Sequence, residues 1–165
     1  MIEKSWPFAE KLIHDILDAT AKLHQQLVLE AELLLTGQQA ELIDSSTNLK
    51  KRLAAQLEEL NMQFGQLLST EQLSCNHEGI NLYLHRAEAA GLPIASVLTD
   101  WEELQQLCIQ CKTLNDQNGA SIELLSIHAK RSLDILKGKT RTANTYGRNG
   151  TTQSESINHT LAYYL

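Results

Sequence analysis

The fold is decided by residues 97–136, which read VLTDWEELQQLCIQCKTLNDQNGASIELLSIHAKRSLDIL. This stretch contains no Pro and a single Gly, Gly119. Its seam positions step by alternating threes and fours, as in a heptad repeat on one long helix: Trp101, Leu104, Cys108, Cys111, Asn115, Asn118, Ile122, Leu125 and Ala129. Leu133 and Leu136 widen this seam to a stripe. Because a lone helix of about 60 Å cannot shield such a stripe from water, other long helices must pack against it.

Two further stretches carry the same spacing and predict partner helices over Pro7–Thr36 and Gln39–Ser69. The first has seam positions at Ile13, Ile16, Thr20, Leu23, Leu27, Glu30 and Leu34, and the second has them at Leu42, Ser46, Leu49, Leu53, Leu57, Leu60, Phe64 and Leu67. Gly37 stands where a C-terminal cap is expected, and Pro7 is tolerated in a first helical turn. The short link between the two stretches predicts that their helices run antiparallel.

The remaining segments are a connection and a tail. Between Ser69 and Ser96, the stretch Ile80–Ala90 predicts a short helix with Leu82, Leu84 and Ala87 available to pack. Gly138 ends the long third helix, and the Thr-, Asn- and Gly-rich residues that follow cannot bury enough apolar surface to fold alone. The sequence therefore predicts an all-α fold, an elongated antiparallel three-helix bundle over residues 1–138 with a short connecting helix and a flexible tail over 139–165.

Composition narrows the class of protein. The chain has 165 residues, a net charge of −6, 5% aromatic residues and two Pro, which is typical of one domain of long helices. The acidic balance disfavours binding to nucleic acid or to an anionic membrane. No apolar run approaches the roughly 20 residues of a membrane span, and Met1–Glu10 does not resemble a signal peptide. Three cysteines, an odd count, fit free thiols in a reducing cytoplasm.

Cys108 and Cys111 form a C-x-x-C pair, for which three interpretations compete. A zinc site needs a second ligand pair, and the only candidates, Cys75 and His77, have no zinc-finger spacing. A thioredoxin-like redox motif belongs at a strand-to-helix turn rather than in a heptad seam. Both cysteines occupy seam positions, so the favoured interpretation is that they are small apolar residues of the core.

No catalytic constellation stands out, so the sequence predicts neither an enzyme nor a cofactor or metal. Helical phosphotransfer domains carry a His three residues before a Lys-Gly pair. Lys137 and Gly138 form such a pair, but Asp134 stands in the His position.

Asn115, Asn118 and Gly119 break the local rules of the seam. Polar residues at heptad core positions cost stability and fix register, and Gly in a helix costs about 1 kcal/mol relative to Ala. Residues that depart from the heptad pattern in this way either have a function or fix the register in which the helices pack. Because the third helix is longer than its partners, its last turns are expected to extend beyond the bundle and to present an apolar face to a partner helix.

Taken with the Leu-Thr-Gly at the end of the first helix and the Gly91-Leu92-Pro93 link, these residues resemble a known family. Asn115, Asn118-Gly119, Leu133, Leu136, Tyr146-Gly147 and Gly150 are similar to the C-terminal signature of the FlgN flagellar export chaperones. The resemblance covers residues about 8 to 150, and its most specific part is Asn-Gly followed by Tyr-Gly-x-x-Gly.

The resemblance implies a cytoplasmic chaperone that holds the hook–filament junction proteins FlgK and FlgL by their C-terminal helices. It implies that Asn115, Asn118, Gly119, Ile122, Leu125, Ala129, Leu133 and Leu136 bind the substrate protein. It further implies that Tyr146, with Gly147 and Gly150, contacts the export gate protein FlhA. Tyr163 and Tyr164, in the apolar cluster Leu161–Leu165 at the end of the tail, are alternative gate contacts; that cluster could equally dock on the chain's own bundle.

One alternative from another class remains. A coiled-coil adaptor without an export role would self-associate through the same seam as a stable homodimer. The chaperone hypothesis predicts instead a 1:1 complex with a helical peptide, although the free chaperone could also dimerise.

Overall fold

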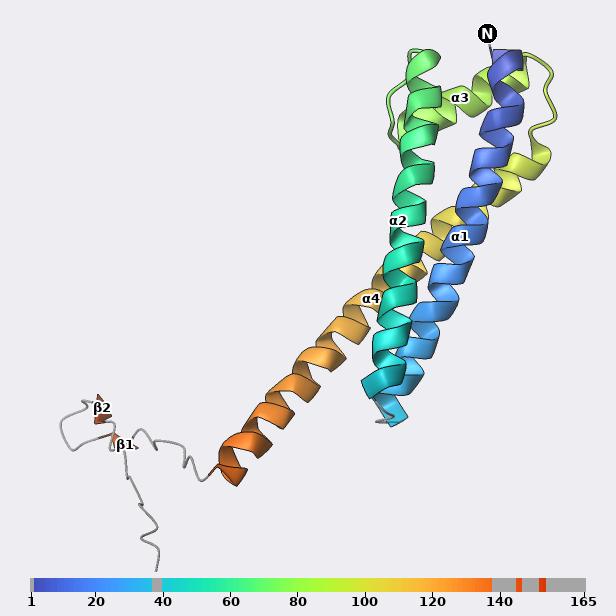
Figure 1. Ribbon diagram of the computed structural model, residues 1–165. Coiled ribbons are helices and arrows are strands. Elements are labelled where there is room, and N and C mark those ends of the chain that lie inside the picture. The colour runs from blue at the N-terminus through green and yellow to red at the C-terminus, as the bar shows by residue number, and fades with distance from the viewer. Residues whose placement is uncertain (1, 37–39, 138–144, 147–151, 154–165) are drawn as a thin grey trace, which may run out of the picture. The chain divides into compact units, whose positions relative to one another are not determined.

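Helices make up almost all of the computed structural model, which describes residues 2–36, 40–137, 145–146 and 152–153 (Figure 1). The four helices are α1 (Ile2–Thr36), α2 (Ala40–Thr70), α3 (His77–Ala89) and α4 (Ala95–Leu136). Two short strands, β1 (Thr145–Tyr146) and β2 (Thr152–Gln153), pair antiparallel. The prediction of a helical fold is therefore confirmed, with helices over residues 2–36, 40–70, 77–89 and 95–136 and non-helical links at 71–76 and 90–94.

The chain divides into two compact units, Met1–Ser121 and Ile122–Leu165, and the division falls within α4. The predicted division into a bundle over residues 1–138 and a tail over 139–165 stays a prediction, because most of residues 138–165 lie outside the described part of the chain.

In the first unit, α1 and α2 lie side by side and antiparallel, and α3 crosses them near the N-terminus of α1 (Figure 1). All four helices contribute to one apolar core: Trp6, Ala9, Ile13, Ile16, Leu17, Phe64, Leu68, Ile80, Tyr83, Leu84, Ala87, Val97 and Leu104. The short connecting helix α3 therefore contributes to the core together with the three long helices.

α1 begins at Ile2, and the predicted start at Pro7 is wrong. Pro7 lies inside the helix, although it lacks an N–H for the helical ladder. Tertiary contacts stabilise the extra turn: Trp6 is buried and stacks on Tyr83 with ring centroids 6.2 Å apart. Ser5 Oγ donates to Glu71 Oε1 at 2.8 Å. These partners lie more than 60 residues away in sequence, so local signals at Pro7 do not reveal them.

α3 is held at both ends by local signals. At its N-terminus, Asn76 Oδ1 accepts a hydrogen bond from the Gly79 N–H at 2.8 Å, which is a standard N-cap. At its C-terminus, Gly91 adopts a φ of +75°, and the Leu92 N–H bonds to the Ala87 carbonyl at 3.1 Å. This left-handed residue ends the helix where the sequence predicts a Gly-Leu-Pro link.

The packing face of α3 differs in one position from the prediction. Leu84 and Ala87 are buried as expected, but Leu82 is exposed and Tyr83 is completely buried. Residues 80, 83, 84 and 87 follow the i, i+3, i+4, i+7 spacing of one helical face, and Leu82 lies on the opposite side. The ends of α2, α3 and α4 otherwise lie within three residues of the predicted ones.

None of the helices among the described residues is both long enough and apolar enough to span a bilayer.

Tyr83 gives a first testable prediction. Burial has the largest effect and raises the pKa of its phenol, the hydrogen bond with Ser5 lowers the pKa, and the charge of Glu71 raises it. Because its pKa is raised in the folded state, the neutral phenol contributes to the free energy of unfolding. This contribution is fully present below the pKa of an unfolded tyrosine, about 10, and is lost as the pH rises through the folded-state pKa. The urea midpoint of the wild-type chain should therefore fall above pH 10, and that of Tyr83→Phe should fall less. A Tyr146→Phe control should follow the wild type; parallel curves for all three chains would contradict the assignment.

Candidate functional site

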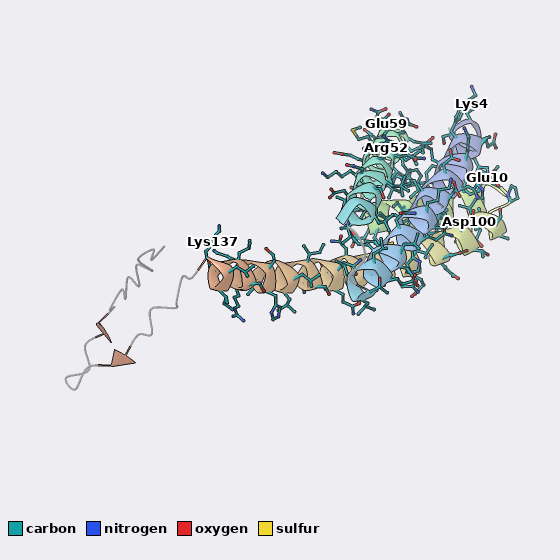
Figure 2. All side chains as sticks on the ribbon, turned by 60° about the horizontal axis from the view of Figure 1, so that its bottom comes forward. Lys4, Glu10, Arg52, Glu59, Asp100 and Lys137 are labelled. Atoms are coloured by element: carbon teal, nitrogen blue, oxygen red, sulfur yellow. The ribbon has the colours of Figure 1, made fainter. Side chains whose placement is uncertain are left out.

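The C-terminal part of α4, residues 122–136, has its large apolar side chains exposed to solvent. Ile122, Leu125, Leu133 and Leu136 are all exposed, with Leu133 at 52% and Leu136 at 82%. Ala129, the fifth apolar residue expected to bind the substrate, is also exposed. Figure 2 shows the side chains of this segment standing out around the helix as far as Lys137. A stripe of apolar side chains left in water favours binding to a partner.

A second apolar face on the same segment was not recognised from the sequence. Leu124, Ile127 and Ile135 are exposed as well, with Leu124 at 59%. Leu124 and Leu133 are nine residues apart, which is two and a half helical turns, so they lie on opposite sides of the helix. The segment therefore exposes apolar side chains on two sides, with charged residues such as Glu123 and Lys130 between them.

Charged side chains of the first unit lie on the outer faces of α1 and α2. Lys4 and Glu10 on α1, and Arg52 and Glu59 on α2, are exposed and point away from the helices that carry them (Figure 2). α1 and α2 thus have polar outer faces, and the segment 122–136 also carries charged residues, Glu123, Lys130, Arg131 and Asp134, beside its exposed apolar ones.

Asn118 lies in the core of the first unit and is 3% exposed. Its side-chain amide donates to the Leu27 carbonyl at 2.9 Å and to Glu30 Oε2 at 3.0 Å, both on α1. Asn115 and Gly119 are exposed, and nothing lies within 4 Å of the place where a Cβ on Gly119 would stand. The structure thus brings Asn118 to α1 and leaves the other two residues open to solvent.

Glu30 completes this buried polar cluster. Its side chain is fully buried, and Lys50 Nζ of α2 donates to both of its carboxylate oxygens at 2.8 Å. A buried carboxylate without such partners would be strongly destabilising. The Glu30–Lys50–Asn118 cluster therefore fixes three helices in one register. The sequence signal was available, because an acid and an amide each occupy a seam position.

The two cysteines of the C-x-x-C pair have different surroundings. Cys111 is buried against α1, with its Sγ 3.9 Å from the Thr20 carbonyl, and burial followed by the neighbouring Cys108 raises the pKa of its thiol. Cys108 is exposed, so its predicted place in the core is wrong. The reason is geometric: Cys111 and Asn118 of α4 contact α1, and Cys108 is turned about 60° from Cys111 around the helix. Within the described residues, no group of three His, Cys, Asp or Glu side chains is placed to hold a metal ion.

An apolar groove lies over α1 between α2 and α4, with a volume of about 550 Å³. Its lining includes Ile16 and Leu23 of α1, Leu57 of α2, and Ile109 of α4. No residue of this groove belongs to the expected substrate-binding set. The groove is therefore an apolar surface separate from residues 122–136, and the sequence did not predict it.

The residues expected to contact an export gate are only partly described. Tyr146 lies in β1 and pairs with Thr152 of β2. Gly147, Gly150, Tyr163 and Tyr164 lie outside the described residues.

These features define an all-helical protein with a core fixed by a buried polar cluster and a helix segment whose apolar side chains face solvent. The comparison with protein-family models identifies its family. The family model described as FlgN protein matches residues 9–154, so the chain belongs to the FlgN family of flagellar export chaperones. Neither the curated proteins nor the solved structures gave a match to the chain. Family membership supports a chaperone role rather than an enzymatic one.

Proposed function

We propose that this chain is a cytoplasmic chaperone that binds the C-terminal helices of FlgK and FlgL and delivers them to the export gate protein FlhA. The single observation that carries the proposal is the exposure of large apolar side chains along residues 122–136. Membership of a flagellar export chaperone family supports it.

The binding surface in this proposal is the stripe Ile122, Leu125, Ala129, Leu133 and Leu136, flanked by the exposed Asn115 and Gly119. An amphipathic helix of the substrate packs its apolar face against this stripe. Asn118 has a supporting role, because its amide is already bonded to α1. It holds α4 in register while the residues that follow bind the substrate.

Calorimetric titration with the C-terminal helical segments of FlgK and FlgL tests this function. Binding should be 1:1, with a negative heat-capacity change because apolar surface is buried. Analytical ultracentrifugation of the free chain and of the mixture gives the stoichiometry independently. A stable homodimer that binds neither segment would favour the coiled-coil adaptor and would contradict the chaperone proposal.

The gate contact is proposed to involve Tyr146 together with Gly147 and Gly150. Replacing Tyr146 with Ala should leave substrate affinity unchanged and reduce secretion of FlgK and FlgL, because the tyrosine lies outside the substrate-binding stripe. Pull-down with FlhA and secretion assays measure the two effects separately. Tyr163→Ala and Tyr164→Ala are the matched controls: if they reduce secretion and Tyr146→Ala does not, the gate contact lies at the end of the chain.

A further inference from the structure

The groove over α1 has the geometry of a helical bundle that lacks one helix. Its walls carry side chains spaced by threes and fours on each of three helices: Ile13, Ile16, Thr20 and Leu23 on α1, Leu57, Asn61 and Phe64 on α2, and Trp101, Leu104, Cys108 and Cys111 on α4. Three such ladders around one hollow match the regular spacing of side chains on a fourth helix. The α1 ladder covers about 15 Å, or about three turns of an occupant helix.

The lining of the groove restricts the chemistry of that helix. None of the described residues that line it is Asp, Glu, Lys or Arg. Its polar side chains include the amides of Asn61, Asn76 and Gln105, the hydroxyl of Thr20 and the imidazole of His77. Because burying an unpaired charge is costly, the inward face of the occupant must be apolar and uncharged.

Trp101 contributes a large aromatic side chain to the groove. The indole Nε1 of Trp101 is buried and has no hydrogen-bond acceptor among the described residues. The ring lies beside His77, with centroids 6.1 Å apart, and both residues line the groove. Trp6 Nε1, which does not line the groove, also lacks an acceptor, so the unpaired indole N–H of Trp101 describes the lining and does not identify the occupant.

We propose that this groove is a second binding site for the exported protein and receives an amphipathic helix with an uncharged inner face. The inference rests on the proposed function, because it assigns the groove to the same substrate that binds residues 122–136. A second copy of the chain is disfavoured as the occupant, since each copy carries a net charge of −6.

The native cysteines report directly on the groove. Cys75 and Cys108 line it and are exposed, whereas Cys111 is buried. N-ethylmaleimide should therefore modify Cys75 and Cys108 in the free chain, and peptide mass mapping gives the rate at each site. A saturating C-terminal segment of FlgK or FlgL should slow both reactions by at least about fivefold if it fills the groove. Cys111 should react slowly with and without the segment and serves as the internal control.

A substitution that places a charge in the groove tests the same proposal independently. Ile109 lines the groove and is 62% exposed, so Ile109→Glu leaves the core intact. Affinity for the segment should fall by at least about tenfold, because the bound helix would bury the new carboxylate. Phe8→Glu is the matched control: Phe8 is 67% exposed and does not line the groove, so its substitution should leave affinity unchanged.

The outcomes separate this inference from the proposed function. If the segment binds, the two thiols stay unprotected and Ile109→Glu is neutral, the groove assignment is wrong and the proposed function stands. If neither segment binds at all, the proposed function fails and the groove assignment fails with it. Protection that increases with chaperone concentration in the absence of substrate would show that a second copy fills the groove. Slow reaction of Cys75 and Cys108 at every concentration of the free chain would show that the chain fills its own groove, and either result overturns the proposal.

Discussion

Replacing Leu133 with Asp should weaken binding of the FlgK and FlgL helices by at least about 100-fold, because the complex would bury a carboxylate in place of an apolar side chain. Leu133 is 52% exposed in the free chain, so the substitution should leave the helical content unchanged. Calorimetry gives the affinity, and far-ultraviolet circular dichroism gives the helical content of the same samples. Leu125→Asp should behave in the same way, since Leu125 lies on the same stripe and is exposed.

Leu124→Asp is the matched control for this result. Leu124 is 59% exposed and lies on the opposite side of the helix from Leu133. Its substitution should change affinity by less than about threefold if only the proposed stripe contacts the substrate. Equal losses at both positions would mean that the substrate surrounds the segment and contacts its second apolar face as well. A loss of helicity in Leu133→Asp would place that residue in a core and contradict the proposed surface.

Replacing Lys50 with Met should lower the free energy of unfolding by about 3–5 kcal/mol, since it leaves the fully buried carboxylate of Glu30 without a counter-charge. Such a loss is a large fraction of the stability of a typical domain. Urea denaturation, followed by circular dichroism, measures it. Lys51→Met changes the next residue, which is exposed, and should alter stability by less than about 0.5 kcal/mol.

A double variant separates the cost of an unpaired charge from the contribution of the ion pair. Glu30→Leu combined with Lys50→Met removes both charges and should recover most of the stability lost in Lys50→Met. Asn118 keeps its bond to the Leu27 carbonyl in this variant. If the double variant is as unstable as Lys50→Met, lost packing rather than an unpaired charge explains the effect.

The helices could be predicted from sequence because periodicity is a local property. Residues 97–136 carry a heptad spacing almost without interruption, and the helix that forms, Ala95–Leu136, differs from it by two residues. The start of α1 could not be predicted, since Ser5 and Trp6 are held by Glu71 and Tyr83. Nothing near Pro7 in the sequence indicates that partners so far along the chain will stabilise an extra turn.

The candidate site could be predicted only in part. Heptad spacing places Ile122, Leu125 and Leu133 on one face, and the family signature indicates their use. Spacing does not show which seam residues α1 will cover, so Cys108 was assigned to the core although it faces solvent. The pairing of Asn118 with Glu30 depends on how α4 and α1 are aligned in space. The groove depends on the alignment of three helices. The heptad spacing of one helix contains neither kind of information.

Both tryptophans of the chain, Trp6 and Trp101, lie in the first unit, and their surroundings give the protein an optical signal of its own. Trp6 is 4% exposed and stacked on Tyr83, so its emission should be blue-shifted and insensitive to ligands. Trp101 lines the groove and is only half-buried, so an apolar helix that enters should shift its emission to shorter wavelength. A Trp6→Phe chain would thus follow loading and release of its cargo in real time by intrinsic fluorescence, with no attached dye.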